Sequence, residues 1–223
     1  MDAVIKVGGS LAENPAALKR LCRKLGEIGE QHSVTVVAGG GVFADVVREM
    51  DKRFALAAGT THRMAILGMD QYGLLLSGMI PSSCIVYSFD DAAKFSDAKR
   101  VPVFLPSRLI IQEGVLEASW DVTSDSIAAH LAHRLDAAKL ILATDVDGIF
   151  TMDPKKPADA EFVKEISAVE LVSLDERTSV DRCLPRLLLE TPLECFVVNG
   201  RYPQRIKRIL TGQPTVCTRV TAK

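Results

Sequence analysis

The sequence contains no apolar run near the length of a bilayer span, and no basic stretch followed by an apolar one marks a signal peptide. It also lacks an excess of charge of one sign, since the formal net charge is only -1. Such a balance predicts neither a nucleic-acid-binding nor a membrane-binding surface. The composition therefore predicts a cytoplasmic protein with no membrane anchor and no nucleic-acid partner.

Cysteine and histidine are too scattered to predict a metal site. No CxxC pair occurs and the number of cysteines is odd, so we expect reduced thiols, mostly in the core. His130 and His133 are three residues apart, but no third ligand lies near them in the sequence. No metal ligand is therefore assigned. The five cysteines are Cys22, Cys84, Cys183, Cys195 and Cys217.

What the 223 residues do contain is typical of a globular protein, with 48% hydrophobic and 25% charged residues. Short, continuously apolar runs alternate with helical patterns, and such runs are typical of strands covered on both faces. This alternation predicts an α/β fold, a three-layer αβα sandwich with a mainly parallel central sheet. Strands are expected at residues 3–7, 34–38, 84–87, 103–105, 140–144, 195–198 and 215–218.

Helices are expected between these strands. Asn14 can cap the first helix and Pro15 can open it. A hairpin is expected at residues 109–119, and it would divide one domain (1–223) into an N-terminal lobe (about 1–118) and a C-terminal lobe (about 119–223). The other helices are expected after the glycines at 39–41 and at residues 62–77, 122–135, 181–190 and 203–210.

The helix expected at residues 62–77 carries apolar residues on more than one face. This pattern predicts a helix buried all round, either in the core or at a subunit contact. We favour the second interpretation, which predicts a homodimer or a larger homo-oligomer.

Two glycine clusters follow predicted strands and precede predicted helices: Gly8-Gly9 and Gly39-Gly40-Gly41. Glycine lets backbone N–H groups approach an anion closely, and a helix N-terminus adds favourable potential. A tight strand–helix turn would also require glycine, so each cluster alone leaves both interpretations open.

Two common nucleotide motifs do not explain the clusters. The GxxxxGK[ST] phosphate-binding pattern is absent, because here the lysine precedes the glycines. Residues 39–44 fit GxGxxA, a dinucleotide-binding variant, but the stretch about 20 residues further on is helical in pattern and supplies no strand that ends in an acidic residue. A nicotinamide-dependent oxidoreductase is therefore disfavoured.

Polar residues gather where predicted strands end. Lys6 would deliver a compact positive charge to the ligand-binding edge of a parallel sheet, or it could simply extend to solvent. Asp125 begins a predicted helix, where the dipole alone would favour a carboxylate. The run Thr144-Asp145-Val146-Asp147-Gly148 suits a nucleotide, although an acidic turn would look similar.

As a set, these motifs resemble those of the amino-acid kinase superfamily over essentially the whole chain. The resemblance rests on Lys6-Val7-Gly8-Gly9-Ser10, the Gly39–Gly41 triplet, Thr123-Ser124-Asp125, Thr144 to Ile149 and the closing stretch VVNGRYPQRIKRILTG. It implies the carbamate-kinase-like fold of that family and an ATP-dependent transfer of a phosphoryl group. It also implies Mg²⁺ bridging the ATP oxygens.

The resemblance further implies roles for individual residues. Lys6 would bind the transferring phosphoryl group, and Asp125 would orient Lys6. Arg186 either replaces a second family lysine or is a solvated helix residue. Nucleotide contacts are expected from Gly8, Gly9, Ser10, Thr144, Asp145, Asp147, Gly148, Phe150 (where relatives carry tyrosine), Asp153 and Lys155. Acceptor contacts are expected from Gly39, Gly40, Gly41, Thr123, Ser124 and His62, the last being otherwise a capping or interface residue.

A narrower resemblance concerns the acceptor. The stretches GGGVFADVVREMD, HRMAILGMDQYG, VTSDSIA and SVDRCLPRLLLE are similar to the branch that phosphorylates [5-(aminomethyl)furan-3-yl]methyl phosphate in methanofuran biosynthesis. The implied reaction turns a phosphate monoester into a diphosphate. UMP kinase, isopentenyl phosphate kinase and a non-catalytic nucleotide- or oxyanion-binding protein on the same fold remain the alternatives.

Overall fold

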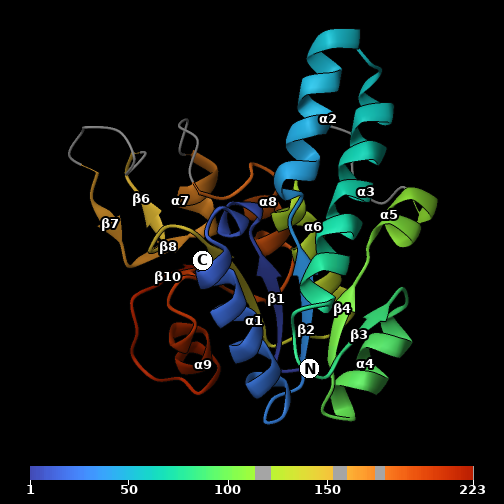
Figure 1. The fold of residues 1–223 in the computed structure, drawn as a ribbon. Helices are drawn as coiled ribbons and strands as arrows, with labels where there is room; N and C mark the ends of the chain where they lie inside the picture. Colours follow the sequence, from blue (N-terminus) through green and yellow to red (C-terminus); the bar gives the residue numbers. More distant parts are fainter. Residues whose placement is uncertain (114–121, 153–159, 174–178, 223) are drawn as a thin grey trace.

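A computed structural model describes residues 1–113, 122–152, 160–173 and 179–222 (Figure 1). Its centre is an eight-stranded sheet in the order β3-β4-β2-β1-β5-β9-β10-β8, in which β9 and β10 pair antiparallel and the other neighbours pair parallel. The predicted α/β class with a mainly parallel sheet is confirmed. The strands are β1 (Ala3–Val7), β2 (Val34–Ala38), β3 (Ser83–Val86), β4 (Val101–Phe104), β5 (Lys139–Thr144), β8 (Glu165–Ser167), β9 (Glu194–Asn199) and β10 (Thr218–Thr221).

A separate two-stranded sheet joins β6 (Ile149–Phe150) and β7 (Phe162–Val163). The predicted cap of the first helix is present, because Asn14 Oδ1 accepts the N–H of Ala17 at 3.0 Å. The helices are α1 (Pro15–Gly29), α2 (Gly41–Phe54), α3 (Ala58–Ser77), α4 (Phe89–Asp97), α5 (Ser107–Glu113), α6 (Ser124–Arg134), α7 (Ala168–Ser173), α8 (Leu184–Leu189) and α9 (Gln204–Leu210), with a short 3-10 helix, η1 (Gly9–Glu13).

Helices pack on both faces of the sheet, because consecutive side chains of a strand point to opposite sides. In β1, Ile5 and Val7 join a core that includes Leu21 of α1, whereas Val4 joins a second core that includes Leu131 of α6. All five side chains are fully buried. The continuous apolar runs in the sequence therefore reflect strands that are buried on both sides.

The hairpin expected at residues 109–119 is wrong for its first part, because residues 109–113 belong to helix α5. Asp70 of α3 accepts both the N–H and the hydroxyl of Ser107, which fixes the start of that helix. Ile110 then turns its side chain into the core, at 3% exposure. Residues 114–119, including the expected lobe boundary, lie outside the described residues.

Other boundaries differ by a few residues. The last strand is displaced from 215–218 to Thr218–Thr221, since Arg219 and Val220 pair with β9 and β8. The helix expected at 181–190 begins only at Leu184, after a turn in which Asp181 caps it. Helices α4 and α7 were not expected.

Helix α3 begins four residues earlier than expected and is not buried all round. Together with α2 it projects beyond the end of the sheet (Figure 1). Leu67, Leu74 and Leu75 are 47%, 49% and 46% exposed in the single chain. No helix in the described ranges is long and apolar enough to span a bilayer.

Candidate functional site

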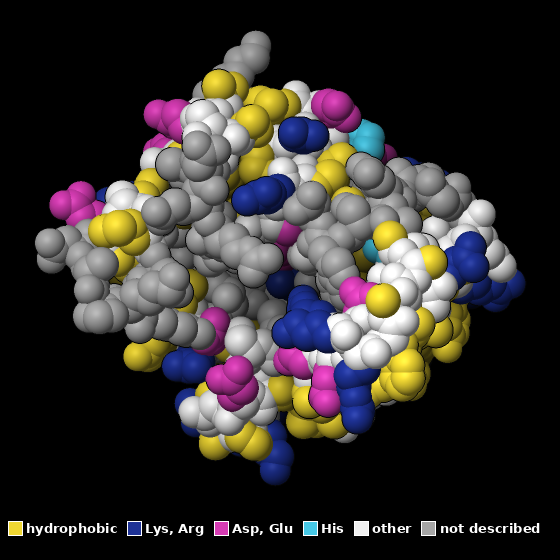
Figure 2. Space-filling view, turned by 90° about the horizontal axis from the view of Figure 1, so that it is seen from above, with side chains coloured by type: hydrophobic (Ala, Val, Ile, Leu, Met, Phe, Trp, Pro, Cys, Tyr) yellow, Lys and Arg dark blue, Asp and Glu magenta, His cyan; other side chains and the backbone are white. Residues whose placement is uncertain are grey.

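The predicted site residues gather at the carboxyl ends of β1, β2 and β5. These strands lie side by side, and Lys6 is in register with Val37 on one side and Leu142 on the other. Viewed onto this edge, the molecule is hollowed near its centre, with basic side chains around the hollow (Figure 2). The end of a parallel sheet is where ligands of such folds bind.

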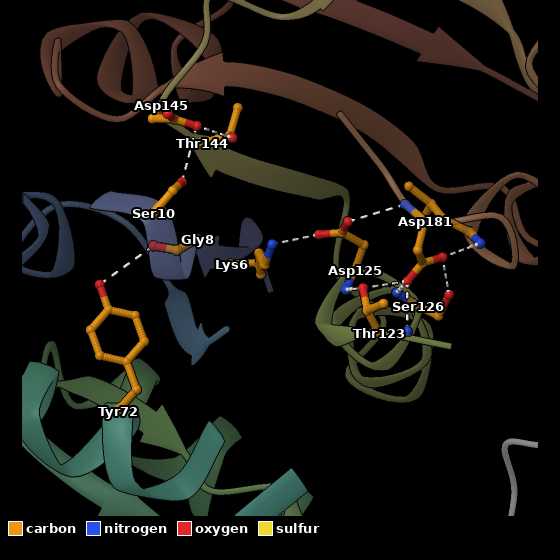
Figure 3. Close-up of polar contacts among 11 residues, drawn as sticks. Lys6, Gly8, Ser10, Tyr72, Thr123, Asp125, Ser126, Thr144, Asp145 and Asp181 are labelled. Carbon is orange, nitrogen blue, oxygen red and sulfur yellow. Dashed lines mark hydrogen bonds and ion pairs between the residues drawn. The ribbon is translucent and has the colours of Figure 1, made fainter. Parts of the chain in front are cut away.

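Lys6 forms an ion pair with Asp125 in a largely buried position (Figure 3). The distance from Lys6 Nζ to Asp125 Oδ1 is 2.6 Å, and the two side chains are 12% and 8% exposed. Burial raises the pKa of the Asp125 carboxyl, although the Lys6 ammonium opposes that shift. Lys6 is thus held at the strand end, and it does not simply extend to solvent.

The two glycine clusters pack directly against each other. A Cβ on Gly9 would overlap the backbone of Gly41, and a Cβ on Gly39 would lie 3.0 Å from the backbone nitrogen of Gly9. Gly41 also has a φ of 54°, which favours glycine. Close approach of two backbones therefore explains why neither loop carries side chains.

Neighbouring elements fix the first loop. The N–H of Gly8 donates to the carbonyl of Ala143 in β5 at 2.8 Å. The hydroxyl of Tyr72, buried on α3, donates to the carbonyl of Gly8 at 3.4 Å (Figure 3). The loop after β1 is thereby tied to both the neighbouring strand and helix α3.

A cavity of ≈ 700 Å³ opens beside these loops, between α2, α3 and the start of α6. It is within the size range of small-molecule sites. His62, expected at a helix start, lies one turn inside α3 and lines this cavity. Other predicted residues along its wall are Gly9, Ser10, Gly40, Gly41, Thr123 and Ser124.

A second polar cluster follows β5. Asp145 Oδ1 accepts the hydroxyl of Ser10 at 3.0 Å, so this loop contacts the loop after β1 (Figure 3). Asp147 Oδ1 accepts Arg205 at 2.6 Å and Asn199 at 3.1 Å. Thr144, at the end of β5, donates its hydroxyl to Asp145 at 3.4 Å.

Gly148 and Phe150, which follow in the chain, pack against Phe162 of β7. A Cβ on Gly148 would lie 2.7 Å from the Phe162 ring, and the ring of Phe150 packs edge-on against Phe162 at a centroid distance of 5.5 Å. Asp153 and Lys155 lie outside the described residues.

Arg186, the predicted second positive charge, lies on α8. It is exposed on α8, and its side chain forms no hydrogen bond or ion pair with another residue that the structure describes. Its assignment as the second positive charge stays a prediction.

Asp181 is a site residue that sequence reasoning missed. Its carboxylate accepts hydrogen bonds from both the N-terminus of α6 and that of α8, and its own N–H donates to Asp125 Oδ2 at 3.3 Å. The sequence offers a weak signal, an aspartate at the start of the helix expected at 181–190, where capping aspartates are common.

Comparisons with known proteins agree on the fold. The chain is 31% identical over 219 residues to [5-(aminomethyl)furan-3-yl]methyl phosphate kinase of Methanocaldococcus jannaschii, covering 97% of this chain and 96% of that protein. It is 27% identical over 225 residues to uridylate kinase of Methanothrix thermoacetophila, covering 95% and 96%. The crystal structure of uridylate kinase from Archaeoglobus fulgidus matches with a TM-score of 0.78 at 23% identity, covering 99% of this chain and 100% of that one.

A model of the amino acid kinase family matches residues 1–182, which include β1, both glycine loops and Asp125. The match therefore spans the Lys6–Asp125 pair and both glycine loops, whereas Asn199 and Arg205 lie beyond it. The chain belongs to the amino acid kinase family and is a kinase, a phosphotransferase.

Proposed function

We propose that this kinase transfers the γ-phosphoryl group of ATP to a small phosphate monoester. The observation that carries the proposal is the buried Lys6–Asp125 pair directly beneath two glycine loops. Phosphoryl transfer requires alignment and charge neutralisation more than covalent help from the protein. A fixed ammonium supplies charge neutralisation, and two glycine loops that carry no side chains let a phosphate approach the backbone closely.

In the proposed reaction, an oxygen of the acceptor phosphate attacks the γ-phosphorus and the bond to the β-phosphate oxygen breaks. The products are ADP and a diphosphate ester. Lys6 stabilises the negative charge of the phosphoryl group during transfer, and Asp125 keeps the ammonium in place. An acceptor phosphate is already anionic, so no strong general base is needed.

Mg²⁺ would neutralise part of the charge of the ATP phosphates. Within the described ranges, no three His, Cys, Asp or Glu side chains converge as a metal site. This donor set suits an ion held mainly by phosphate oxygens and water, which is how proteins commonly hold Mg²⁺ beside nucleotides. Asp145 is the carboxylate that would contact its hydration shell.

The acceptor and the nucleotide can be assigned to opposite sides of the Lys6–Asp125 pair. We assign the acceptor to the cavity between α2 and α3, in the N-terminal lobe (about 1–118), where His62 and Thr123 line the wall. We assign the nucleotide to the loop after β5, in the C-terminal lobe (about 119–223), where Ser10 and Asp145 meet. The γ-phosphoryl group would then lie between them, next to Lys6.

For the acceptor we propose [5-(aminomethyl)furan-3-yl]methyl phosphate, which would give the protein a role in methanofuran biosynthesis. The support is the 31% identical relative named for that substrate, which aligns over nearly the whole chain. UMP is the second candidate, because uridylate kinases are also relatives over nearly the whole chain.

The test is an acceptor screen with purified protein and Mg-ATP, read as ADP release and product mass. We expect ADP and a product heavier by one phosphoryl group with the aminomethylfuran phosphate. Faster turnover of UMP or isopentenyl phosphate would overturn the acceptor assignment. ATP binding without turnover of any phosphate acceptor would instead support a non-catalytic nucleotide-binding protein.

We also propose that two copies associate through α3. Leu67, Leu74 and Leu75 place three half-exposed side chains on a helix that projects from the sheet, and soluble monomers rarely leave such side chains clustered in water. A second copy of the chain would present the same face, which suits an isologous contact.

A further inference from the structure

Asp181 is bound more extensively than a single helix cap requires. Its Oδ2 accepts the N–H of Thr123 at 2.9 Å, the hydroxyl of Thr123 at 2.8 Å and the N–H of Ser126 at 3.0 Å. Its Oδ1 accepts the hydroxyl of Ser126 and the N–H groups of Cys183 and Leu184, the last two at 3.1 and 2.8 Å. One carboxylate thus joins the N-termini of α6 and α8.

The backbone of Asp181 is also connected to the Lys6–Asp125 pair. The N–H of Asp181 donates to Asp125 Oδ2 at 3.3 Å, while Asp125 Oδ1 pairs with Lys6 Nζ at 2.6 Å (Figure 3). The two oxygens of Asp125 are therefore divided between Lys6 and the Asp181 backbone. If the segment before α8 moved, Asp125 would be free to rotate and Lys6 would lose its fixed partner.

We propose that Asp181 is a positioning residue for phosphoryl transfer, which orients Lys6 through Asp125 without touching either substrate. The inference rests on the proposed function, because it assigns catalysis to Lys6. Its geometric basis is the set of six accepted hydrogen bonds together with the seventh, donated one.

Asp181 also acts on Asp125 through its charge. The groups that face Asp125 are Lys6 of β1, Asp181 and the buried Cys195 of β9. Burial raises the pKa of Asp125, Lys6 lowers it, and the negative charge of Asp181 raises it further. The Lys6 ammonium and the N–H of Asp181 both lower this pKa, so loosening their contacts opposes the effect of removing the Asp181 charge. Replacing Asp181 should therefore change the pKa of Asp125, and kcat against KM is the readout that separates positioning from simple capping.

The test compares Asp181→Asn with Asp70→Asn. Asp70 is a matched control, since it accepts the N–H and hydroxyl of Ser107 at the start of α5. We expect both variants to lower the melting temperature. Asp181→Asn alone should lower kcat, by ~10-fold or more as for a misplaced reacting group, with the KM values nearly unchanged. The acid limb of its kcat profile should shift relative to that of Asp70→Asn.

A gentler pair of variants covers the case in which Asp181→Asn does not fold. Ser126→Ala removes one hydroxyl that donates to Asp181, and Ser107→Ala removes the equivalent hydroxyl that donates to Asp70. We expect similar losses of stability, with a fall in kcat only for Ser126→Ala. Equal kcat in both variants would overturn the proposal.

One readout does not depend on the substrate. Carbon-13 NMR of the Asp125 carboxyl, assigned with Asp125→Asn, should show a shifted pKa in Asp181→Asn and no change in Asp70→Asn. An unchanged Asp125 pKa together with an unchanged kcat would reduce Asp181 to a structural cap. Absence of turnover by the wild-type protein would instead count against the proposed function.

Discussion

Lys6 is the residue on which the proposed chemistry depends. We expect Lys6→Ala to lower kcat by ~10²–10³-fold, the size of effect seen when one charge-stabilising donor is removed from a transition state. The fold should persist with a lower melting temperature, because Lys6 is in neither hydrophobic core but its loss leaves the buried Asp125 carboxyl without a charge partner. Steady-state kinetics and a thermal melt of the same preparation measure both effects.

Lys24→Ala is the matched control for this variant. Lys24 also forms an ion pair, with Glu27 one turn away, and it lies in the second half of α1. We expect its kcat to equal that of the wild type. Retention of most activity in Lys6→Ala would rule out Lys6 as the catalytic cation.

The raised pKa of Asp125 predicts that kcat falls at an unusually high pH on the acid side of its pH profile. It must be ionised to hold Lys6, and burial raises its pKa above the usual ~3.9 of aspartic acid. Activity should therefore fall at a higher pH than for an exposed aspartate, as measured by kcat against pH. Because the folded state binds this proton more tightly than the unfolded chain, this group alone adds stability as the pH falls. Loss of activity in parallel with unfolding would contradict the assignment.

At this scale the sequence identified residues better than it identified their partners. Lys6 and Asp125 are 119 positions apart and were assigned by motif, and the structure joins them in one ion pair. Asp181 was missed, because its importance lies in the donors around it, and those come from two helices that are distant in sequence. The assignment of Arg186 rests on its approximate spacing alone and stays a prediction.

At the scale of elements, the contact between the two glycine loops makes a sharp prediction. A methyl group on Gly9 would overlap the backbone of Gly41, and backbone cannot move aside as a flexible side chain can. We expect Gly9→Ala to destabilise the fold by ~1–3 kcal/mol and to abolish most activity. Urea unfolding and the kinase assay measure the two losses.

Gly59→Ala is the control for this substitution. Gly59 lies in the first turn of α3, and no atom lies within 4 Å of the place where its Cβ would be. Alanine is the better helix former, so the variant should be as stable as the wild type or slightly more so. A Gly9→Ala protein that behaves like Gly59→Ala would show that the loops are not tightly packed.

The type of an element could be predicted from the sequence where the whole segment is buried. The prediction failed where a single contact with a distant residue determines whether the segment is a helix or a strand. The runs that form β1, β2 and β5 are mostly apolar, and the structure confirms them as parallel strands. Residues 109–113 also read as a strand of a hairpin. They form a helix because Asp70, distant in sequence, satisfies the first backbone donor at Ser107. The sequence around residues 107–113 does not reveal that Asp70 will be its partner.

At the scale of the whole molecule, the exposed leucines of α3 predict self-association. We expect a dimer by analytical ultracentrifugation, and a monomer when Leu74→Lys and Leu75→Lys are combined, because two charges would be buried at the contact. Val216→Lys, at a similarly exposed apolar residue before β10, should leave the dimer intact. A wild-type protein that sediments as a monomer would refute the association.

The position of β1 in the sheet has a consequence for how the protein is made. β1 lies between β2, which begins at residue 34, and β5, which begins at residue 139. During synthesis one edge of the first strand must wait for more than half of the chain to emerge before it finds its second neighbour. Late closure of this kind slows folding and leaves an open strand edge that invites aggregation. The lysine that would give the enzyme its chemistry thus lies on a strand whose second neighbour is made much later than the strand itself.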